Sequence, residues 1–312
     1  MLIIRNLSTV KKTDKRVLTL GTFDGVHKAH QKIFKSVKDC SLKNDFTSMV
    51  VTFEPHPRTV VSKDFKVHLL STLEEKVEIA EKSGIDELLV LDFTPEFAQQ
   101  SYKEFIENIL VNKVGFKHII IGHDHKFGKD RFGNEEKLSE LGEKFGFTVK
   151  VESEVLFNNE VISSTKIRNY LLQGNLSDAG KFLGRNYIFA GIVVKGERRG
   201  RILGFPTANI EVSYKNKLIP KIGVYAVKCT IENEIVLGVM NIGVRPTFGK
   251  HGDLVIEVHL FNFSSDIYGA DIRVEFLKRL RDEKKFESKE ELIYQIERDK
   301  KEAIQIIGNI IN

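Results

Sequence analysis

Two histidines three residues apart follow a glycine-bounded turn near the start of the chain. The segment Gly21–His30 comes directly after the apolar run Val17–Leu20. A buried strand that leads into such a turn and then a helix presents backbone N–H groups and a positive helix end to phosphate. His27 and His30 fall on one face of that helix, so both can donate hydrogen bonds to one anionic group. The pattern predicts a nucleotide site; the alternative is a surface turn with two solvated histidines.

The glycine spacing in this segment matches neither of the two common nucleotide fingerprints. A Walker loop needs a Lys-Ser/Thr pair after its second glycine, and the dinucleotide fingerprint needs three glycines. Gly21 and Gly25 satisfy neither pattern.

A second candidate segment, Glu54–Arg58, follows the apolar strand that ends at Phe53. In an open α/β sheet, ligands bind at the carboxyl ends of strands. Its two prolines predict an extended loop, from which Arg58 can make a bidentate contact with phosphate. The same residues would also suit a stiff surface loop.

A third segment, Gly122–Gly128, carries two histidines on either side of an aspartate. Such a trio suggests a metal site, but alternation along the chain should point His123 and His125 one way and Asp124 the other. We expect Asp124 to bond the ribose or the rest of the nucleotide.

A fourth segment, Ile162–Arg168, opens a helix with three consecutive hydroxyl side chains. The hydroxyls at a helix start supply caps or phosphate contacts, and Arg168 lies one turn along the same face as Thr165. By itself this is an ordinary helix start. The three hydroxyl residues are Ser163, Ser164 and Thr165.

In the second half of the chain, the segment Lys195–Asn209 combines basic residues with three glycines. Such a loop can wrap an anion, and Thr207 and Asn209 should face the same way on the strand that follows. Together they offer two oxygen ligands to a hard cation such as Mg²⁺. The competing interpretation is a flexible basic hairpin. The glycines are Gly196, Gly200 and Gly204.

An acidic residue, Glu257, stands in a later strand pattern. It alternates with His259, and Val258 and Leu260 occupy the intervening positions. Glu257 should therefore lie on the more polar face of its strand.

The elements that position these residues differ between the two halves of the chain. Up to about residue 150, apolar runs alternate with amphipathic segments, which predicts βαβ units and a doubly wound parallel sheet. The expected strands are 17–20, 48–53, 87–91, 118–121 and 147–151. The expected helices are 28–43, 72–82, 101–112, 135–144, 165–172 and 177–182.

After Gly184 the pattern changes to short strands with Gly and Pro turns. Short strands without intervening helices predict a closed or nearly closed antiparallel barrel. The expected strands are 187–194, 207–210, 223–231, 235–242, 254–260 and 271–280, and an amphipathic helix over 288–307 should pack Leu292 and Ile296 toward the barrel. The predicted domains are residues 1–184 and 185–312.

The composition is that of an ordinary globular protein with two domains. The chain has 312 residues, of which 41% are hydrophobic and 29% charged, and its net charge of +5 is spread among interspersed acidic residues. Nucleic-acid binding therefore gains little support. The two cysteines, Cys40 and Cys229, are far apart, as expected of reduced thiols in core positions. With no apolar run near membrane length and no signal-peptide layout, we expect a cytoplasmic protein that binds no membrane, a monomer or weak homo-oligomer.

The four segments of the first half resemble the nucleotidyltransferase motifs of the prokaryotic bifunctional riboflavin kinase and FAD synthetase family. Gly21–His30 resembles its signature with the His-x-Gly-His element, except that Ala29 stands where the family has Gly. The Pro-His-Pro element is present at 55–57. Gly122–Gly128 is similar to Gly-x-Asp-Phe-x-Phe-Gly, with His125 in place of Phe, and Ile162–Arg168 matches Ile-Ser-Ser-Thr-x-Ile-Arg without a substitution.

The second half resembles the riboflavin kinase part of the same family. Its Gly-Phe-Pro-Thr-Ala-Asn motif is unbroken at Gly204–Asn209. The segments Asn241–Gly249 and Glu257–Phe261 are also similar to that family. The resemblance implies that Glu257 is the base that takes the riboflavin 5′-hydroxyl proton.

The resemblance implies an enzyme that phosphorylates riboflavin with MgATP to FMN and then adenylylates FMN to FAD, with release of pyrophosphate. It implies the following site residues. ATP in the first domain would contact Gly21, Thr22, Phe23, Asp24, His27, His30, Asp124, Ser163, Ser164, Thr165 and Arg168. ATP in the second would contact Gly196, Gly200, Gly204, Pro206, Thr207 and Asn209. The catalytic groups would be His27, His30, Arg168 and Glu257, the Mg²⁺ ligands Thr207 and Asn209, and the flavin contacts His56, Pro57, Arg58 and Arg298, with Asp299 a further candidate near the isoalloxazine.

Two other functions compete with this interpretation. One is a monofunctional kinase whose first domain has decayed, which is suggested by Ala29 and His125 and which would make FMN without FAD. The other is a flavin-sensing or RNA-binding regulator that recognises a nucleotide without turnover. The retained Glu257, Thr207 and Asn209 argue against the regulator.

Overall fold

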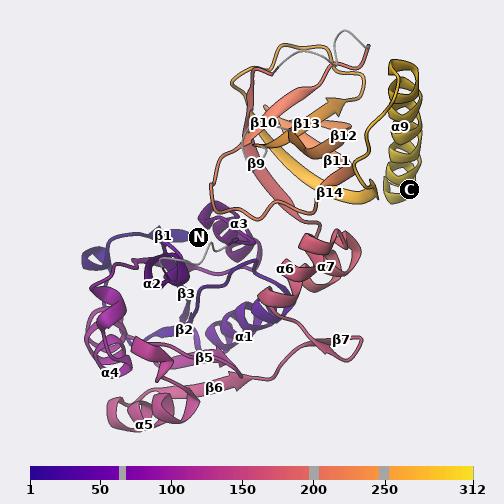
Figure 1. The fold of residues 1–312 in the computed structure, drawn as a ribbon. Helices are drawn as coiled ribbons and strands as arrows, with labels where there is room; N and C mark the ends of the chain where they lie inside the picture. The colour runs from indigo at the N-terminus through magenta and orange to yellow at the C-terminus, as the bar shows by residue number, and fades with distance from the viewer. Residues whose placement is uncertain (63–67, 197–203, 246–252, 312) are drawn as a thin grey trace. The chain divides into compact units, whose positions relative to one another are not determined.

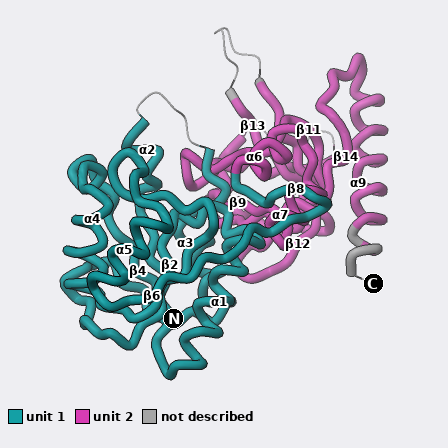
Figure 2. The backbone as a smooth tube through the Cα atoms, turned by 90° about the horizontal axis from the view of Figure 1, so that it is seen from below, with its two compact units in different colours: residues 1–164 teal, residues 165–312 magenta. Residues whose placement is uncertain are grey.

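The computed structural model describes residues 1–62, 68–196, 204–245 and 253–311. The chain forms two compact units, residues 1–164 and 165–312 (Figure 2). None of the helices in the described ranges combines the length and the apolar character that a membrane span requires.

The first unit is built on a six-stranded parallel sheet with the order β1-β4-β3-β2-β5-β6. The strands are β1 (Leu2–Ile4), β2 (Arg16–Leu20), β3 (Thr47–Glu54), β4 (Glu87–Asp92), β5 (His118–Gly122) and β6 (Thr148–Glu152). The doubly wound parallel sheet predicted from the sequence is confirmed.

Successive residues of one strand enter two different apolar cores, one on each face of the sheet. In β3, Met49 and Val51 pack with residues of the π-helix η3 (Phe105–Val114) and of α5 (Glu135–Phe145), whereas Val50 packs with residues of α1 (Lys28–Asn44) and α3 (Leu73–Lys82). Burial on both faces explains why the strands are continuous apolar runs. The other α-helices of the sheet region are α2 (Pro57–Val61) and α4 (Tyr102–Glu104) (Figure 1).

The structure adds three features to the predicted first unit. The edge strand β1 has one buried residue, Ile4, so it carries little periodic signal. The helix expected over 101–112 is a short α4 followed by the π-helix η3. A two-stranded hairpin, β7 (Leu156–Phe157) and β8 (Glu160–Val161), precedes the Ser-Ser-Thr segment.

The second unit contains a closed antiparallel barrel with the order β10-β13-β12-β11-β14-β9 (Figure 1). The predicted antiparallel barrel is therefore confirmed. Its strands are β9 (Ile188–Val194), β10 (Ala208–Val212), β11 (Gly223–Ile231), β12 (Glu234–Arg245), β13 (Asp253–Leu260) and β14 (Asp271–Arg281), and α6 (Ser164–Gln173) and α7 (Leu176–Leu183) come before them.

The terminal helix α9 (Lys289–Ile311) packs against β11, β12 and β14. A buried ion pair fixes it: the Arg281 guanidinium contacts the Asp299 carboxylate, with Nη2 2.7 Å from Oδ2. Gln295 donates a hydrogen bond of 2.7 Å to Asp299 Oδ1. Asp299, a candidate flavin contact by sequence, therefore has its carboxylate engaged within the unit.

Both cysteines are free thiols. Cys229 is buried in β11, and burial raises the pKa of its thiol to about 12. Cys40, on α1, is partly buried. The Cys229 thiol is therefore protonated at neutral pH and behaves as a small apolar side chain.

Candidate active sites in the two units

The loop between β2 and α1 holds two non-glycine residues in the left-handed region of backbone space. Phe23 has φ 46° and Val26 has φ 35°. Positive φ is costly for a β-branched residue and persists only where the surroundings enforce it. A Cβ at Gly21 would lie 2.9 Å from the Phe23 ring, so this position also requires the smallest residue. Such stored strain is common at ligand-binding loops.

The two histidines of this loop form a stacked pair at the start of α1. His27 is the residue that precedes the helix, and its ring lies 3.6 Å from that of His30 with an interplanar angle of 18°. Phe23 meets the His30 ring edge-on at 5.2 Å. The two rings thus share one side of the helix, as their spacing predicts.

The surroundings of His30 favour its neutral form. Burial lowers the pKa of His30 well below its usual value, and the nearby His27, Lys76 and His125 lower it further. The residue as a whole is partly exposed, but its Nδ1 is buried and has no hydrogen-bond partner among the described residues. A buried polar atom without a partner, next to several basic groups, is suited to an anionic ligand.

Asp24, expected to contact ATP, ties the loop to other parts of the first unit. Its buried Oδ1 accepts hydrogen bonds from the backbone N–H groups of Leu70 at 2.9 Å and Ser71 at 3.1 Å. The Ser164 hydroxyl donates to the Asp24 carbonyl at 2.9 Å. The structure therefore brings the first and fourth predicted segments together, while the contact of Asp24 with ATP stays a prediction.

A buried lysine, Lys76, belongs to this cluster and is not among the site residues predicted from the sequence. It lies on α3, where burial lowers its pKa, while the carboxylates of Asp24, Glu54 and Glu75 act in the opposite direction. Helical spacing from the buried Leu73 could have placed Lys76 on the inward face.

The Pro-His-Pro segment differs from the extended loop that its prolines predict. The Glu54–Pro55 bond is cis, and Pro57 begins the short helix α2. Buried His56 caps this helix, because its Nδ1 accepts the backbone N–H of Arg58 at 3.2 Å. Proline is favoured at the first position of a helix, where its missing N–H costs nothing.

The histidines of Gly122–Gly128 have separate surroundings, so the predicted alternation is wrong. The backbone turns here, with the His125 N–H donating to the Gly122 carbonyl at 3.1 Å. His123 Nε2 lies 3.7 Å from the Glu154 carboxylate, while the His125 ring stacks on Phe127 at 5.5 Å. In the described ranges no three His, Cys, Asp or Glu side chains are grouped to hold a metal.

His125 should make the stability of the first unit depend on pH. Burial lowers its pKa from 6.5 to about 4, and its Nε2 is buried without a hydrogen-bond partner in the described structure. As the pH falls from 6.5 to about 4, the unfolded chain takes up a proton at His125 that the folded chain does not. The free energy of unfolding therefore decreases, by up to about 1.4 kcal/mol per pH unit.

We expect the variant His125→Phe to lose this part of the pH dependence while keeping the ring that stacks on Phe127. Urea unfolding of both proteins at about pH 8 and about pH 4.5 measures the difference. The gap in stability between variant and parent should grow toward low pH in favour of the variant. Equal pH slopes would contradict the buried, neutral state of His125.

The Ser-Ser-Thr segment begins α6 at Ser164, one residue before the predicted start. The side chain of Ser164 makes the bond to Asp24 described above. Ser163, Thr165 and Arg168 carry predicted phosphate roles that stay predictions.

In the second unit, three polar residues form a row across neighbouring barrel strands. Asn209 of β10 lies opposite Glu257 of β13, which lies opposite Asn241 of β12. Opposed residues of antiparallel strands project to the same face. The neighbours Ile256 and Val258 are buried, so the row faces away from the barrel core. This confirms that Glu257 lies on the polar face.

The glycine loop is described only in part. Gly200 and residues 246–249 lie outside the described residues. Gly196 packs so closely on Asn209 that a Cβ would collide with the amide. Gly204 has φ 82°, ahead of the partly exposed Thr207. A hollow of about 570 Å³ has a lining that includes Lys195, Gly196, Asn209, Glu211, Tyr214 and Lys217.

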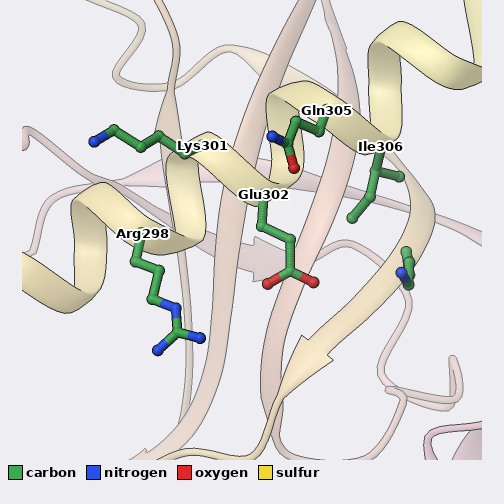
Figure 3. A pocket seen from close by; sticks show the side chains of 6 residues that line it. Arg298, Lys301, Glu302, Gln305 and Ile306 are labelled. Carbon is green, nitrogen blue, oxygen red and sulfur yellow. The ribbon is translucent and has the colours of Figure 1, made fainter.

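A second hollow, of about 520 Å³, lies beside α9 (Figure 3). It is mainly polar and basic, since Arg298 and Lys301 of α9 and Lys278 of β14 line it together with Glu302, Gln305 and Ile306. Arg298, predicted to contact the flavin, is exposed here, and that contact stays a prediction.

Two family models cover most of the chain. The FAD synthetase model matches residues 9–166, and the riboflavin kinase model matches residues 183–307.

Similar proteins carry both of these activities in their names. The bifunctional riboflavin kinase/FMN adenylyltransferase of Bacillus subtilis is 39% identical over 300 residues, which cover 95% of this chain and 94% of that protein. The protein of the same name from Escherichia coli K12 is 34% identical, with 99% and 98% covered. A crystal structure from Streptococcus pneumoniae, described as a macrolide-efflux protein, superposes with a TM-score of 0.87 at 31% identity over 96% of this chain and 97% of that one.

Proposed function

Because this chain belongs to the family of bifunctional riboflavin kinases/FMN adenylyltransferases, we propose which of its residues perform the two reactions. The enzyme phosphorylates riboflavin to FMN with ATP and adenylylates FMN to FAD with a second ATP. For the domain boundary we propose residues 1–184 and 185–312. Its support is the left-handed Gly184 that ends α7, close to residue 183 where the kinase model begins.

For adenylyl transfer, we assign His27, His30 and Arg168 to the triphosphate of ATP. An FMN phosphate oxygen attacks the α-phosphorus, the bond from that phosphorus to the oxygen bridging to the β-phosphate breaks, and pyrophosphate leaves. No protein nucleophile is needed, because positioning and charge neutralisation serve such transition states. The observation that carries this proposal is the stacked pair beside Lys76 and His125, in which the Nδ1 of His30 is buried and has no hydrogen-bond partner in the described part of the chain.

The remaining contacts of the first site are assigned as follows. The nucleotide contacts are Gly21, Thr22, Phe23, Asp24 and Asp124, the triphosphate anchors are Ser163, Ser164 and Thr165, and the flavin contacts are His56, Pro57 and Arg58.

For the kinase reaction, we assign Glu257 as the base. It takes the proton of the riboflavin 5′-hydroxyl, whose oxygen attacks the γ-phosphorus of ATP while the bond to the β-phosphate oxygen breaks. The oxygens of Thr207 and Asn209 would hold Mg²⁺, which supplies charge neutralisation at the phosphates when bound. Hard oxygen donors suit this ion, and Asn209 stands directly opposite Glu257.

The other kinase assignments are ATP contacts at Gly196, Gly200, Gly204 and Pro206 and a flavin contact at Arg298. We also propose that the enzyme works in the cytoplasm as a monomer or weak homo-oligomer. Two observations support the cytoplasm as its compartment. Both reactions consume ATP, and Cys40 and Cys229 are free thiols.

A time course tests the proposal as a whole. The purified protein is incubated with riboflavin and ATP, with and without Mg²⁺, and the flavins are separated by chromatography. FMN should appear first and FAD after it, and both should depend on Mg²⁺. FMN alone would favour the decayed first domain suggested by Ala29 and His125, and no turnover would favour a regulator.

A further inference from the structure

His259 occupies the position on β13 next to the proposed metal and base residues. Glu257 pairs with Asn209, and Val258 pairs with Ala208. If this register continued by one residue, His259 would stand opposite Thr207. The strand β10 begins only at Ala208, however, so the backbone ladder ends before it reaches Thr207.

The His259 side chain makes a contact just where this ladder ends. Its Nδ1 lies 2.9 Å from the carbonyl oxygen of Pro206. A carbonyl only accepts hydrogen bonds, so Nδ1 carries the proton and donates. The ring also meets Phe205 edge-on at 5.5 Å and Phe261 at 5.9 Å. One side chain thus holds the two residues that precede Thr207.

The segment before Thr207 needs such an attachment. Pro206 has no N–H to offer a neighbouring strand, and Gly204, with its left-handed backbone, adds freedom just upstream. A metal ligand that is displaced by about 1 Å can lose much of its effect on catalysis. The groups that orient a ligand therefore matter almost as much as the ligand itself.

We propose that His259 is a positioning residue of the kinase reaction. It anchors the Phe205–Pro206 segment to β13, so that Thr207 stays beside Asn209 and Glu257. This role rests on the proposed function of Thr207 and Asn209 as Mg²⁺ ligands. In this role His259 acts through its contacts with Phe205 and Pro206, and not through a contact with substrate.

Three substitutions separate the hydrogen bond from the ring packing. His259→Ala removes both, His259→Phe keeps a ring against Phe205 and Phe261 but cannot donate, and His259→Asn places an amide N–H where Nδ1 stands. We expect the Ala and Phe variants to need more Mg²⁺ for half-maximal riboflavin phosphorylation. Their kcat/KM for MgATP should fall about 10–100-fold. The Asn variant should recover most of the loss, and the KM for riboflavin should stay unchanged in all three.

The full-length protein supplies its own control, since each variant is also assayed for the conversion of supplied FMN to FAD. That rate should be unaffected. If His259→Ala fails to fold, the comparison of the Phe and Asn variants still tests the role of the hydrogen bond. A Phe variant with parental Mg²⁺ dependence, or an Asn variant as impaired as Phe, overturns the role of the hydrogen bond.

The variant Asn209→Ala distinguishes the failure of this inference from the failure of the proposed function. If Asn209→Ala stops riboflavin phosphorylation while His259→Ala and His259→Phe leave it intact, only the positioning role is wrong. If Asn209→Ala also leaves phosphorylation intact, the metal site is wrong, and the reason for positioning Thr207 is lost with it.

Discussion

The double variant His27→Ala/His30→Ala should accumulate FMN and make almost no FAD from riboflavin and MgATP. The two rings stack on each other at the start of α1, and no described residue forms a hydrogen bond with the buried Nδ1 of His30. Removing one preorganised donor to developing charge costs about 10²–10³ in rate, so the loss of two should exceed about 10³-fold. Riboflavin phosphorylation should continue, because it is assigned to the barrel.

The expected defect concerns the chemical step, so it is measured as the initial rate of FAD formation from supplied FMN and ATP. A matched control is His118→Ala in the same unit. His118 lies at the amino end of β5, where its Nδ1 bonds the Thr148 hydroxyl at 2.7 Å, far from the carboxyl edge of the sheet. The control should keep its FAD synthesis. A double variant that makes FAD at the parental rate would remove the stacked histidines from the mechanism.

The architecture of both units could be predicted because it depends on periodic burial. Strands such as β3, which is buried on both faces, can be recognised as continuous apolar runs. The barrel strands can be recognised from the alternation of apolar and polar residues, as at Ile256–Leu260. The edge strand β1 could not be found this way, because it buries only Ile4. A π-helix at Phe105–Val114 has the same apolar composition as an α-helix, so its different hydrogen bonding left no sequence signal.

The candidate sites were predictable only where chemistry and spacing coincide. His27 and His30 are one helical turn apart, and Glu257 sits in a strand, so their faces follow from regular geometry. The Asp24 carboxylate accepts hydrogen bonds from the backbone N–H groups of Leu70 and Ser71, which are far from it in the sequence. A local sequence pattern cannot predict such a contact.

The buried basic side chains were also difficult to predict from the sequence. Lys76 and His125 were missed or misplaced because their effect on His30 comes from three-dimensional proximity. A charged residue type in the sequence says little about whether the folded chain buries it. In this unit, burial lowers the pKa values of His30 and His125, so both rings are neutral at neutral pH.

The variant Glu257→Gln should abolish FMN formation while leaving the conversion of supplied FMN to FAD intact. Glutamine keeps the size and place of the side chain opposite Asn209 and Asn241 but cannot take a proton. The loss of a positioned general base lowers the rate of proton-coupled transfer by about 10²–10⁴-fold. The rate of FMN formation with saturating riboflavin and MgATP measures the effect. The control Glu234→Gln, at the exposed start of β12, should behave as the parent.

Mixing the two defective proteins gives a stricter test of the assignment of the two reactions to two separate sites. Neither His27→Ala/His30→Ala nor Glu257→Gln alone should make FAD from riboflavin at an appreciable rate. Together they should, because the first releases FMN and the second adenylylates it. The lag before FAD appears should shorten as the concentration of the FMN-producing variant rises. Failure of the mixture, when each protein retains its one remaining activity, would mean that FMN does not leave the chain that makes it.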